Sequence, residues 1–209
     1  MKIRYLESVD STQKYLKNLL KSNAITLPYA VVAREQTAGQ GSRDNSWIGL
    51  KGNLFLSFAI QEMPKDLKPE SASIYYAYIL KETLEKEGST VWLKWPNDFY
   101  INDVKIGGMI TNIVDGIMVC GVGLNLITNP KNFEKLDISI SVEELVQKYL
   151  TNVQKQFSWK QVFSKYKLEF YKSQDFFTHT NNETISLVDT SLNDDGSITS
   201  NKMRIYSIR

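Results

Sequence analysis

A lysine followed by two glycines is the most unusual chemical feature of the chain. Lys105-Ile106-Gly107-Gly108 falls in a segment with β-strand character, and glycine weakens a strand. The pattern makes sense if a ligand lies against the backbone and the lysine reaches an anionic group on that ligand. The alternative is a β-bulge beside a solvated lysine, and these four residues alone leave both interpretations open.

A second polar cluster directly follows an apolar strand. In Lys94-Trp95-Pro96-Asn97-Asp98 the proline ends the strand and fixes the backbone. The tryptophan can pack while Asn97 and Asp98 present polar groups. Because Pro-Asn-Asp is also ordinary turn chemistry, the segment is compatible with either a site or a plain turn.

Two further glycine-containing segments indicate places where a backbone can approach a ligand. Gly39 and Gly41 lie within residues 34–47 and could turn N–H groups toward an anion. Their spacing matches neither the phosphate-binding loop nor the dinucleotide fingerprint, and composition alone favours a flexible surface loop. Residues 121–125 end an apolar strand, where Asn125 would point into cleared space unless the glycines only allow a tight strand crossing.

Composition excludes several classes of protein. Cys120 and His179 are the only cysteine and histidine among 209 residues, so most zinc sites are excluded and no internal disulfide can form. The net charge of +2 indicates no general affinity for nucleic acid. No apolar stretch is long enough for a signal peptide or a membrane-spanning helix. A cytoplasmic protein is expected.

The elements that must position these residues follow from hydrophobic periodicity and turn signals. Helices are predicted over 11–22, between Pro69 and Gly88, and over 142–152 and 159–173. Strands are predicted over 2–9, 29–36, 53–61, near 91–95, and over 98–102, 105–113, 116–126, 184–188, 197–200 and 203–208, with a long loop over 37–52. This order favours an α+β domain with a mixed, largely antiparallel sheet. We predict a catalytic domain over residues 1–176 and a small C-terminal β module over residues 177–209.

Side-chain caps are predicted at three helix starts. Asp10 stands three residues before Gln13, Ser141 before Glu144 and Ser158 before Gln161. Each pair has the spacing of a capping box, in which the two residues satisfy each other's backbone N–H groups.

Taken together and in this order, the motifs resemble the biotin–protein ligases, part of the wider biotin and lipoate ligase family. The matching pieces are Asp10-Ser11-Thr12, Gln36, Ala38-Gly39-x-Gly41, Trp47, Asn53-Leu54, Lys94-Trp95-Pro96-Asn97-Asp98, Lys105-x-Gly107-Gly108 and Gly121-x-Gly123-x-Asn125. They cover about residues 2–130. The resemblance implies a fold like that of the catalytic domain of class II aminoacyl-tRNA synthetases, with a small SH3-like C-terminal β module.

The resemblance also implies a reaction in two steps. The biotin carboxylate attacks the α-phosphate of ATP to give biotinyl-AMP and pyrophosphate, and a lysine of a carrier protein then displaces AMP. ATP and Mg²⁺ are the implied cofactors, biotin is a substrate, and no metal site made by the protein alone is expected. The expected carrier is the biotin carboxyl carrier protein of acetyl-CoA carboxylase.

The resemblance assigns roles to particular residues. The catalytic ones are Lys105, which would neutralise charge, and Asp98, which would help the incoming lysine lose its proton or find its position. The biotin-binding ones are Ser11, Thr12, Gln13, Gln36, Gly39, Gln40, Gly41, Ser42, Lys105, Gly107 and Gly123. The nucleotide-binding ones are Arg43, Trp47, Asn53, Lys94, Asn97 and Asn125.

Alternative functions differ in substrate or in chemistry. A lipoate or octanoate ligase or transferase would share the fold and the lysine, but Gln36 and the short Ala-Gly-x-Gly segment favour the biotin branch. A non-catalytic biotin-binding protein is favoured only by the glycine-containing loop around Gly39 and Gly41, where Gln40 and Ser42 replace residues usual in the family. Since the first predicted strand begins at residue 2, we expect no N-terminal DNA-binding domain and no binding of operator DNA. The resemblance is compatible with a homodimer.

The glycine loop departs from the family pattern. Relatives usually carry arginines where this chain has Gln40 and Ser42, although Arg43 lies beside both. Because neither substituted residue brings charge, we expect biotinyl-AMP to dissociate faster from this protein than from a Gln40→Arg, Ser42→Arg double variant. Release of preformed biotinyl-AMP from both proteins measures the difference, and equal rates would contradict the prediction.

Overall fold

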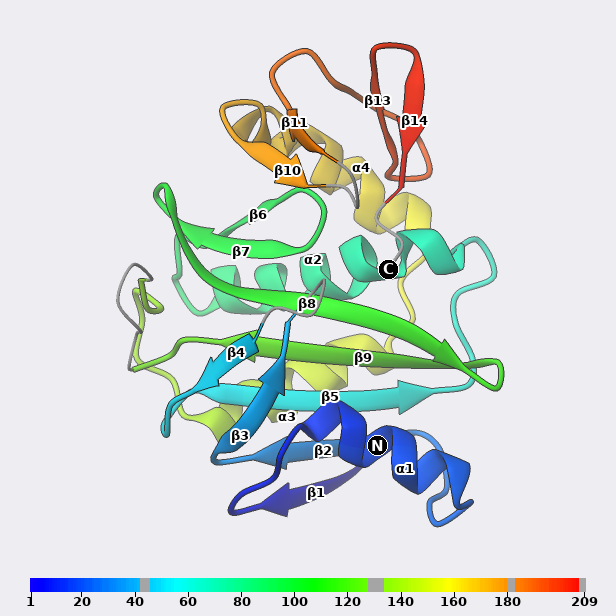
Figure 1. Ribbon diagram of the computed structural model, residues 1–209, viewed down its shortest axis with the longest axis vertical. Helices are drawn as coiled ribbons and strands as arrows, with labels where there is room; N and C mark the ends of the chain where they lie inside the picture. Colours follow the sequence, from blue (N-terminus) through cyan, green and yellow to red (C-terminus); the bar gives the residue numbers. More distant parts are fainter. Residues whose placement is uncertain (42–45, 128–133, 180–182, 207–209) are drawn as a thin grey trace.

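The computed structural model describes residues 1–41, 46–127, 134–179 and 183–206. A seven-stranded sheet, in the order β1-β2-β5-β9-β8-β7-β6, forms its centre (Figure 1). Its strands are β1 (Lys2–Leu6), β2 (Tyr29–Ala33), β5 (Leu54–Ile60), β6 (Trp92–Lys94), β7 (Asp98–Ile101), β8 (Val104–Val114) and β9 (Ile117–Leu124). Only β1 and β2 pair in parallel within this sheet, so the predicted α+β class with a mixed, largely antiparallel sheet is confirmed.

Helices cover both faces of the sheet. They are α1 (Thr12–Lys21), α2 (Ala72–Lys86), preceded by the 3₁₀ turn η1 (Pro69–Ser71), α3 (Val142–Gln154) and α4 (Trp159–Glu169), which continues into η2 (Phe170–Ser173). In Figure 1, α1 lies in front of the sheet while α2 and α3 lie behind it. The predicted helix over 159–173 therefore ends as α helix at Glu169 and tightens to 3₁₀ geometry.

Strand alternation divides the core into two layers. Tyr29 and Val31 of β2 pack with Leu16 of α1, whereas their neighbours Ala30 and Val32 belong to the larger cluster beneath α2 and α3. This division follows from the two-residue period of a strand, which sends successive side chains to opposite faces. Because β2 is apolar on both faces, all five of its residues are buried.

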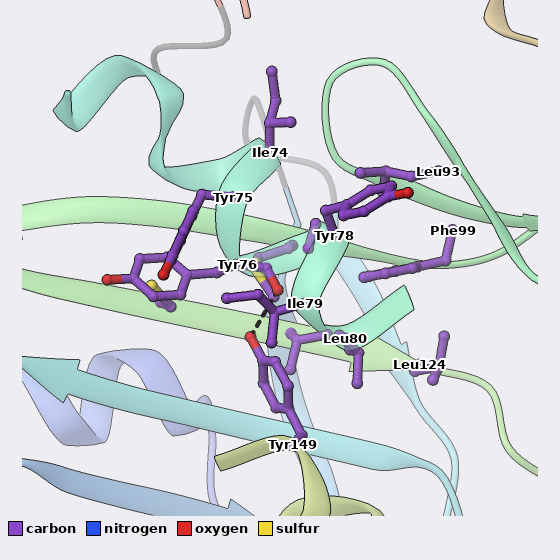
Figure 2. Close-up of a cluster of buried hydrophobic side chains, with 14 of the residues drawn as sticks. Ile74, Tyr75, Tyr76, Tyr78, Ile79, Leu80, Leu93, Phe99, Leu124 and Tyr149 are labelled. Carbon is purple, nitrogen blue, oxygen red and sulfur yellow. Dashed lines mark hydrogen bonds between the residues drawn. The ribbon is translucent and has the colours of Figure 1, made fainter. Parts of the chain in front are cut away.

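The larger core layer is rich in tyrosine. Tyr75 and Tyr76 of α2 meet edge to face at 4.9 Å between ring centroids. Tyr149 of α3 points toward α2 and donates its hydroxyl to the Tyr76 carbonyl at 3.0 Å (Figure 2). A buried phenol needs such a partner, and this bond ties α3 to α2 underneath the sheet.

The cap of the first helix lies one residue later than predicted. Ser11, rather than Asp10, is the N-cap residue, and its hydroxyl accepts from the Lys14 N–H at 3.4 Å. Asp10 instead accepts from the Ser11 N–H and pairs with the Lys14 ammonium, both at 2.8 Å. The predicted capping box with Gln13 is wrong because the Gln13 side chain lines an internal pocket.

The other two caps are present at the predicted residues. Ser141 caps α3 by accepting from the Glu144 N–H at 3.1 Å. Ser158 and Gln161 form a reciprocal capping box at the start of α4. Both serines have extended backbone angles, as a residue just outside a helix requires.

The long loop predicted over 37–52 is partly wrong. Strands β3 (Gln36–Gln40) and β4 (Ser46–Gly49) form an antiparallel hairpin. A Cβ at position 39 would lie 2.6 Å from the Trp47 carbonyl oxygen, so only glycine allows this approach. Small polar residues and glycines conceal the hairpin from composition, because its strands are joined by close backbone contact.

The C-terminal residues form two small sheets apart from the main one. They comprise β10 (Phe177–His179) with β11 (Thr184–Ser186), and β12 (Ser191–Leu192), β13 (Ile198–Ser200) and β14 (Met203–Ile205). Strands β10 and β12 were not among the predicted strands. In Figure 1 these sheets lie above β6 and β7. The domain boundary at residue 176 stays a prediction. No helix in the described ranges is both long and apolar enough to span a bilayer.

A buried ion pair joins α2 to α4. The Lys81 side chain is 3% exposed, and its ammonium lies 2.5 Å from Glu169 Oε1. Tyr78 donates its hydroxyl to the same carboxylate oxygen at 2.9 Å. Removing one member of a buried pair leaves an uncompensated charge, which costs more than the pair itself contributes.

We predict that Lys81→Met lowers the free energy of unfolding by about 3 kcal/mol. Lys165→Met is the matched control, because Lys165 pairs with Glu82 across the same two helices but is 58% exposed; its loss should stay below about 1 kcal/mol. Adding Glu169→Gln to Lys81→Met should recover part of the stability. Urea denaturation measures all of these, and equal losses for the two lysine variants would contradict the prediction.

Candidate functional site

A pocket lies where α1, the β3–β4 hairpin and the middle of the sheet meet. It contains about 510 Å³ of empty space, open solvent at its mouth included, which is within the range of small-molecule sites. Its lining comprises Ser11, Thr12, Gln13, Gln36, Gly41, Trp47, Ser57, Asn97, Asp98, Lys105, Gly108, Met109, Ile110, Gly121, Val122 and Gly123. Three of its glycines come from β8 and β9, where the absence of side chains leaves space above the sheet, and Gly41 follows β3.

Hydroxyls and one amide oxygen form a connected network at one end of the pocket. Gln36 Oε1 accepts from both the backbone N–H and the hydroxyl of Thr12, at 2.8 and 3.0 Å. The Thr12 hydroxyl also lies 2.9 Å from that of Ser57. Because Thr12 and Ser57 are buried, this network holds α1, β3 and β5 in fixed relation.

A buried amide donor at this end has no partner among the described residues. Gln13 is 5% exposed, and its Nε2 atom makes no hydrogen bond within them. A Cβ at position 121 would lie 3.2 Å from that nitrogen, which places the amide against the Gly121 backbone. An unmatched buried donor costs about 1–3 kcal/mol, so the pocket is built to receive an acceptor here.

Charged groups occupy the other end. The Lys105 ammonium lies 2.7 Å from Asp98 Oδ1, and the Lys94 ammonium lies 3.7 Å from Asp98 Oδ2. The Lys105 side chain is 31% exposed and that of Lys94 is 9% exposed. Lys105 is therefore the lysine of this group that lines the pocket.

A change of strand register turns Lys105 toward the pocket. Between β7 and β8, Phe99 pairs with Gly107 but Tyr100 pairs with Lys105, so β8 carries one extra residue. Without this bulge Lys105 would pair one position further along and its side chain would face the core. The bulge considered for the Lys-x-Gly-Gly segment is therefore present, and Lys105 is ion-paired rather than freely solvated.

Neighbouring groups complete the charged end. The Asn97 side-chain amide donates to the Met109 carbonyl, while its Oδ1 atom has no partner among the described residues. Burial, followed by the nearby Asp98 carboxylate, raises the pKa of Tyr100 to about 12. Tyr100 is therefore neutral at physiological pH, and its ring lies 5.7 Å from the Lys94 ammonium.

The β3–β4 hairpin forms a lateral wall of the pocket. Its residue Trp47 packs against Gly123 so closely that a Cβ there would lie 2.7 Å from the indole Cε2 atom. Glycine at position 123 thus lets the hairpin approach β9. Whether Trp47 covers a nucleotide, as predicted, stays a prediction.

Most of the predicted site residues converge on this pocket, but several lie elsewhere. Asn53 and Asn125 are buried and bond to each other at 3.3 Å, and Asn53 Oδ1 also accepts from the Leu126 N–H at 3.0 Å. Gly107 faces β9, since a Cβ there would lie 2.5 Å from the Gly123 carbonyl oxygen. Gly39 and Lys94 lie beside the lining residues rather than among them. Their predicted ligand contacts stay predictions.

Three predicted residues lie wholly or partly outside the described part of the chain. Ser42 and Arg43 lie outside the described residues, and only the backbone of Gln40 is described.

Sequence reasoning did not name six of the lining residues: Ser57, Gly108, Met109, Ile110, Gly121 and Val122. Ser57 is a polar residue inside the apolar strand β5, which is a signal that could have identified it. Gly108 and Gly121 stand within the recognised motifs, and strand alternation decides that they face the pocket.

Metal ligands are not gathered at this site. In residues 1–41, 46–127, 134–179 and 183–206, no group of three or more His, Cys, Asp and Glu side chains could hold a metal ion. The carboxylate in the pocket lining is Asp98, which is paired with lysines.

A model of the biotin/lipoate A/B protein ligase family matches residues 5–129. The chain belongs to this family. The matched range contains every lining residue of the pocket. Family membership therefore rests on the same part of the chain that builds the site.

A solved structure supports the same conclusion for the fold. The chain is similar to the biotin acetyl coenzyme A carboxylase synthetase from Helicobacter pylori, solved with bound biotinylated ATP. The TM-score is 0.94 at 38% identity, and the match covers 98% of this chain and 99% of that one. The small C-terminal sheets are thus part of an architecture that the two chains share.

Relatives known from sequence match over shorter ranges. The bifunctional ligase/repressor BirA of Bacillus subtilis is 30% identical over 151 residues, which are 67% of this chain and 46% of BirA. A biotin–[acetyl-CoA-carboxylase] ligase of Paracoccus denitrificans is 29% identical over 109 residues, which are 48% of this chain and 45% of that protein. The chain spans less than half the length of both relatives.

The contact between Trp47 and Gly123 gives a prediction that needs no ligand. Gly123→Ala should displace the indole and lower the free energy of unfolding by about 1–3 kcal/mol, as overpacking does. In a ¹⁵N-labelled sample the Trp47 indole N–H signal should move while that of Trp92 stays in place. An unmoved Trp47 signal would contradict the packing described here.

Proposed function

We propose that this protein is an ATP-dependent biotin–protein ligase, which forms biotinyl-AMP and transfers biotin to a lysine of a biotin carboxyl carrier protein. One observation carries the proposal: the buried Gln13 Nε2 atom, which has no hydrogen-bond partner among the described residues, and the Lys105 ammonium belong to side chains that line the same pocket. Such a pocket suits a ligand with a polar, uncharged head and an anionic tail. Biotin, with its ureido ring and carboxylate, is a ligand of this kind.

The spacing of the two ends fits one small molecule. Gly121 lies against the Gln13 amide, and Gly123 pairs with Gly108 beside Asp98 and Lys105. Two residues along a strand cover about 7 Å. Since the two glycines face the same side of β9, a ligand tail can lie over the intervening strand from one end to the other.

The polar end would recognise the ureido ring. Gln13 Nε2 would donate a hydrogen bond to the ring carbonyl. The Thr12 and Ser57 hydroxyl oxygens would accept hydrogen bonds from the ring N–H groups. The dithiolane ring of lipoate offers no comparable hydrogen bonds. A site that leaves its buried polar groups unpaired rejects the wrong ligand strongly, so this end favours biotin over lipoate.

The charged end would promote activation of the carboxylate. A carboxylate oxygen attacks the α-phosphorus of ATP, the bond to the β-phosphate oxygen breaks, and pyrophosphate leaves. Because both reactants are anions, their approach requires a cation, and Lys105 would supply it. A fixed cation in a site of low water content contributes about 3 kcal/mol of transition-state stabilisation.

Asp98 would act in the second step. The amine of the carrier lysine attacks the carbonyl carbon of biotinyl-AMP, AMP leaves, and the nitrogen loses a proton. The Asp98 carboxylate lies beside Lys105, where it would hold the incoming amine and accept that proton. Once an anionic ligand engages Lys105, the carboxylate becomes less tightly paired.

Mg²⁺ would accompany ATP. Since the described residues gather no set of metal ligands, the phosphates and water would hold most of the ion's coordination sphere. The reaction is assigned to the cytoplasm, a reducing compartment that suits a chain whose single cysteine is free and buried.

The proposal predicts a specific product. With Mg-ATP, biotin and an apo biotin carboxyl carrier domain, intact mass spectrometry should show the mass gain of one biotinyl group on one lysine. Lys105→Ala should lower the rate at least about 100-fold, as loss of an oxyanion-stabilising group does. Lys165→Ala, which removes an ion-paired lysine elsewhere, should leave the rate unchanged.

Lipoate in place of biotin provides the decisive comparison. A mass gain of the carrier with lipoate but not with biotin would show that the protein is a lipoate ligase. A protein that binds biotin but modifies no carrier with either acid would be a non-catalytic biotin-binding protein. Either result would overturn the proposal.

A further inference from the structure

A turn in the C-terminal sheets is held by the catalytic part of the chain through three consecutive backbone carbonyls. We call Asp194–Gly196, between β12 and β13, the C-terminal turn. The Asp194, Asp195 and Gly196 carbonyl oxygens accept from Trp159 Nε1, Ser71 Oγ and Trp95 Nε1, at 2.8, 2.7 and 2.8 Å. The three donors come from the starts of α4 and α2 and from the turn after β6. Three bonds in a row give this turn a defined place.

The C-terminal turn has a fixed shape of its own. Gly196 has φ of +78°, a conformation that side chains rarely adopt. A Cβ there would lie 2.7 Å from Ile74 Cδ1, in the first turn of α2. The Asp195 carboxylate accepts from the Ser197 hydroxyl at 2.6 Å and pairs with Arg204 of β14 at 2.8 Å. The turn is thus braced from within its own sheet.

Trp95 connects this turn to the pocket. It is 2% exposed, and its backbone N–H donates to Ser173 Oγ at 3.0 Å while its indole donates to Gly196. Both of its N–H groups are therefore bonded to residues that follow the catalytic motifs in sequence. Asn97 and Asp98, two and three residues after Trp95, line the pocket.

We propose that the C-terminal turn positions the charged end of the pocket. Gly196 holds Trp95, Trp95 sets the backbone that carries Asn97 and Asp98, and Asp98 holds the Lys105 ammonium at 2.7 Å. Trp95 and Gly196 are positioning residues that act through Asp98. This inference rests on the proposed function and assigns the C-terminal sheets a part in it.

A purely structural role for the turn makes a different prediction. A general weakening of the fold lowers the amount of active protein. Loss of any buried hydrogen bond of similar strength would then have the same effect. A positioning role instead lowers the rate of the chemical step in folded protein. Biotin binding should change little, because Thr12, Gln13 and Gln36 hold the polar head at the other end of the pocket.

The first test compares two tryptophans of one segment. Trp95→Phe removes the indole donor to Gly196, and Trp92→Phe removes an indole donor to the Asn102 carbonyl at 2.7 Å. We expect Trp95→Phe to lower kcat for biotinyl-AMP formation about 10-fold with KM for biotin within about 2-fold, since small misplacements near reacting groups have such effects. Trp92→Phe should stay within about 2-fold for both. Equal loss of kcat in the two variants would overturn the proposal.

The second test perturbs the turn and leaves Trp95 intact. The chain has four tryptophans, and the indole signal of Trp95 in a ¹⁵N-labelled protein is the one missing from Trp95→Phe. Gly196→Ala should move this signal, leave that of Trp92 in place, and lower kcat in the same direction as Trp95→Phe. If Gly196→Ala does not fold, Ser71→Ala loosens the turn more mildly and should produce a smaller change of the same kind.

The outcomes separate this inference from the proposed function. If wild-type protein formed no biotinyl-AMP, the proposed function would fail, and an unmoved Trp95 signal in Gly196→Ala would separately overturn the positioning role. If wild-type protein is active while Trp95→Phe and Gly196→Ala keep its kcat, the proposed function stands and the C-terminal turn has no positioning role.

Discussion

The extra residue in β8 is the constraint on which the site depends. Strand alternation would otherwise send Lys105 into the core, where an ammonium without a partner is not tolerated. The bulge opposite β7 turns the side chain to the pocket face and brings it to Asp98. Ile106, the residue that the bulge inserts, is fully buried in the core instead. A single change of register therefore provides one apolar anchor and one cation for the pocket.

Other features keep the space above this cation free. Glycines at 108, 121 and 123 keep the sheet surface low between the Gln13 amide and the Lys105 ammonium. The hairpin that carries Trp47 packs against β9 because position 123 has no side chain. Beneath the sheet, the tyrosine-rich layer of α2 and α3 gives β8 and β9 a firm support. Space on one face of the sheet thus coexists with dense packing on the other.

Much of this arrangement could be predicted from the sequence. The α+β class and most elements of the main sheet follow from periodicity and turn signals. The convergence of Thr12, Gln36, Asp98 and Lys105 was implied by the family resemblance that the motifs carry. What the sequence did not reveal depends on contacts between distant segments. The β3–β4 hairpin forms because Gly39 meets the Trp47 backbone, and composition reports such a contact only as loop-like. The motifs likewise did not reveal that Asn53 and Asn125 bond to each other across 72 residues of sequence.

The bond between Trp95 and Gly196 also has a consequence for the order of assembly. It joins residues 101 positions apart, and chains fold from the N-terminus as they leave the ribosome. Every lining residue of the pocket has been synthesised by residue 123, yet the carbonyl that receives the Trp95 indole is still absent. During this interval the nascent chain contains every polar group of the pocket but lacks the hydrogen bond from the Trp95 indole to the Gly196 carbonyl. Completion of the site therefore depends on synthesis of the chain as far as Gly196.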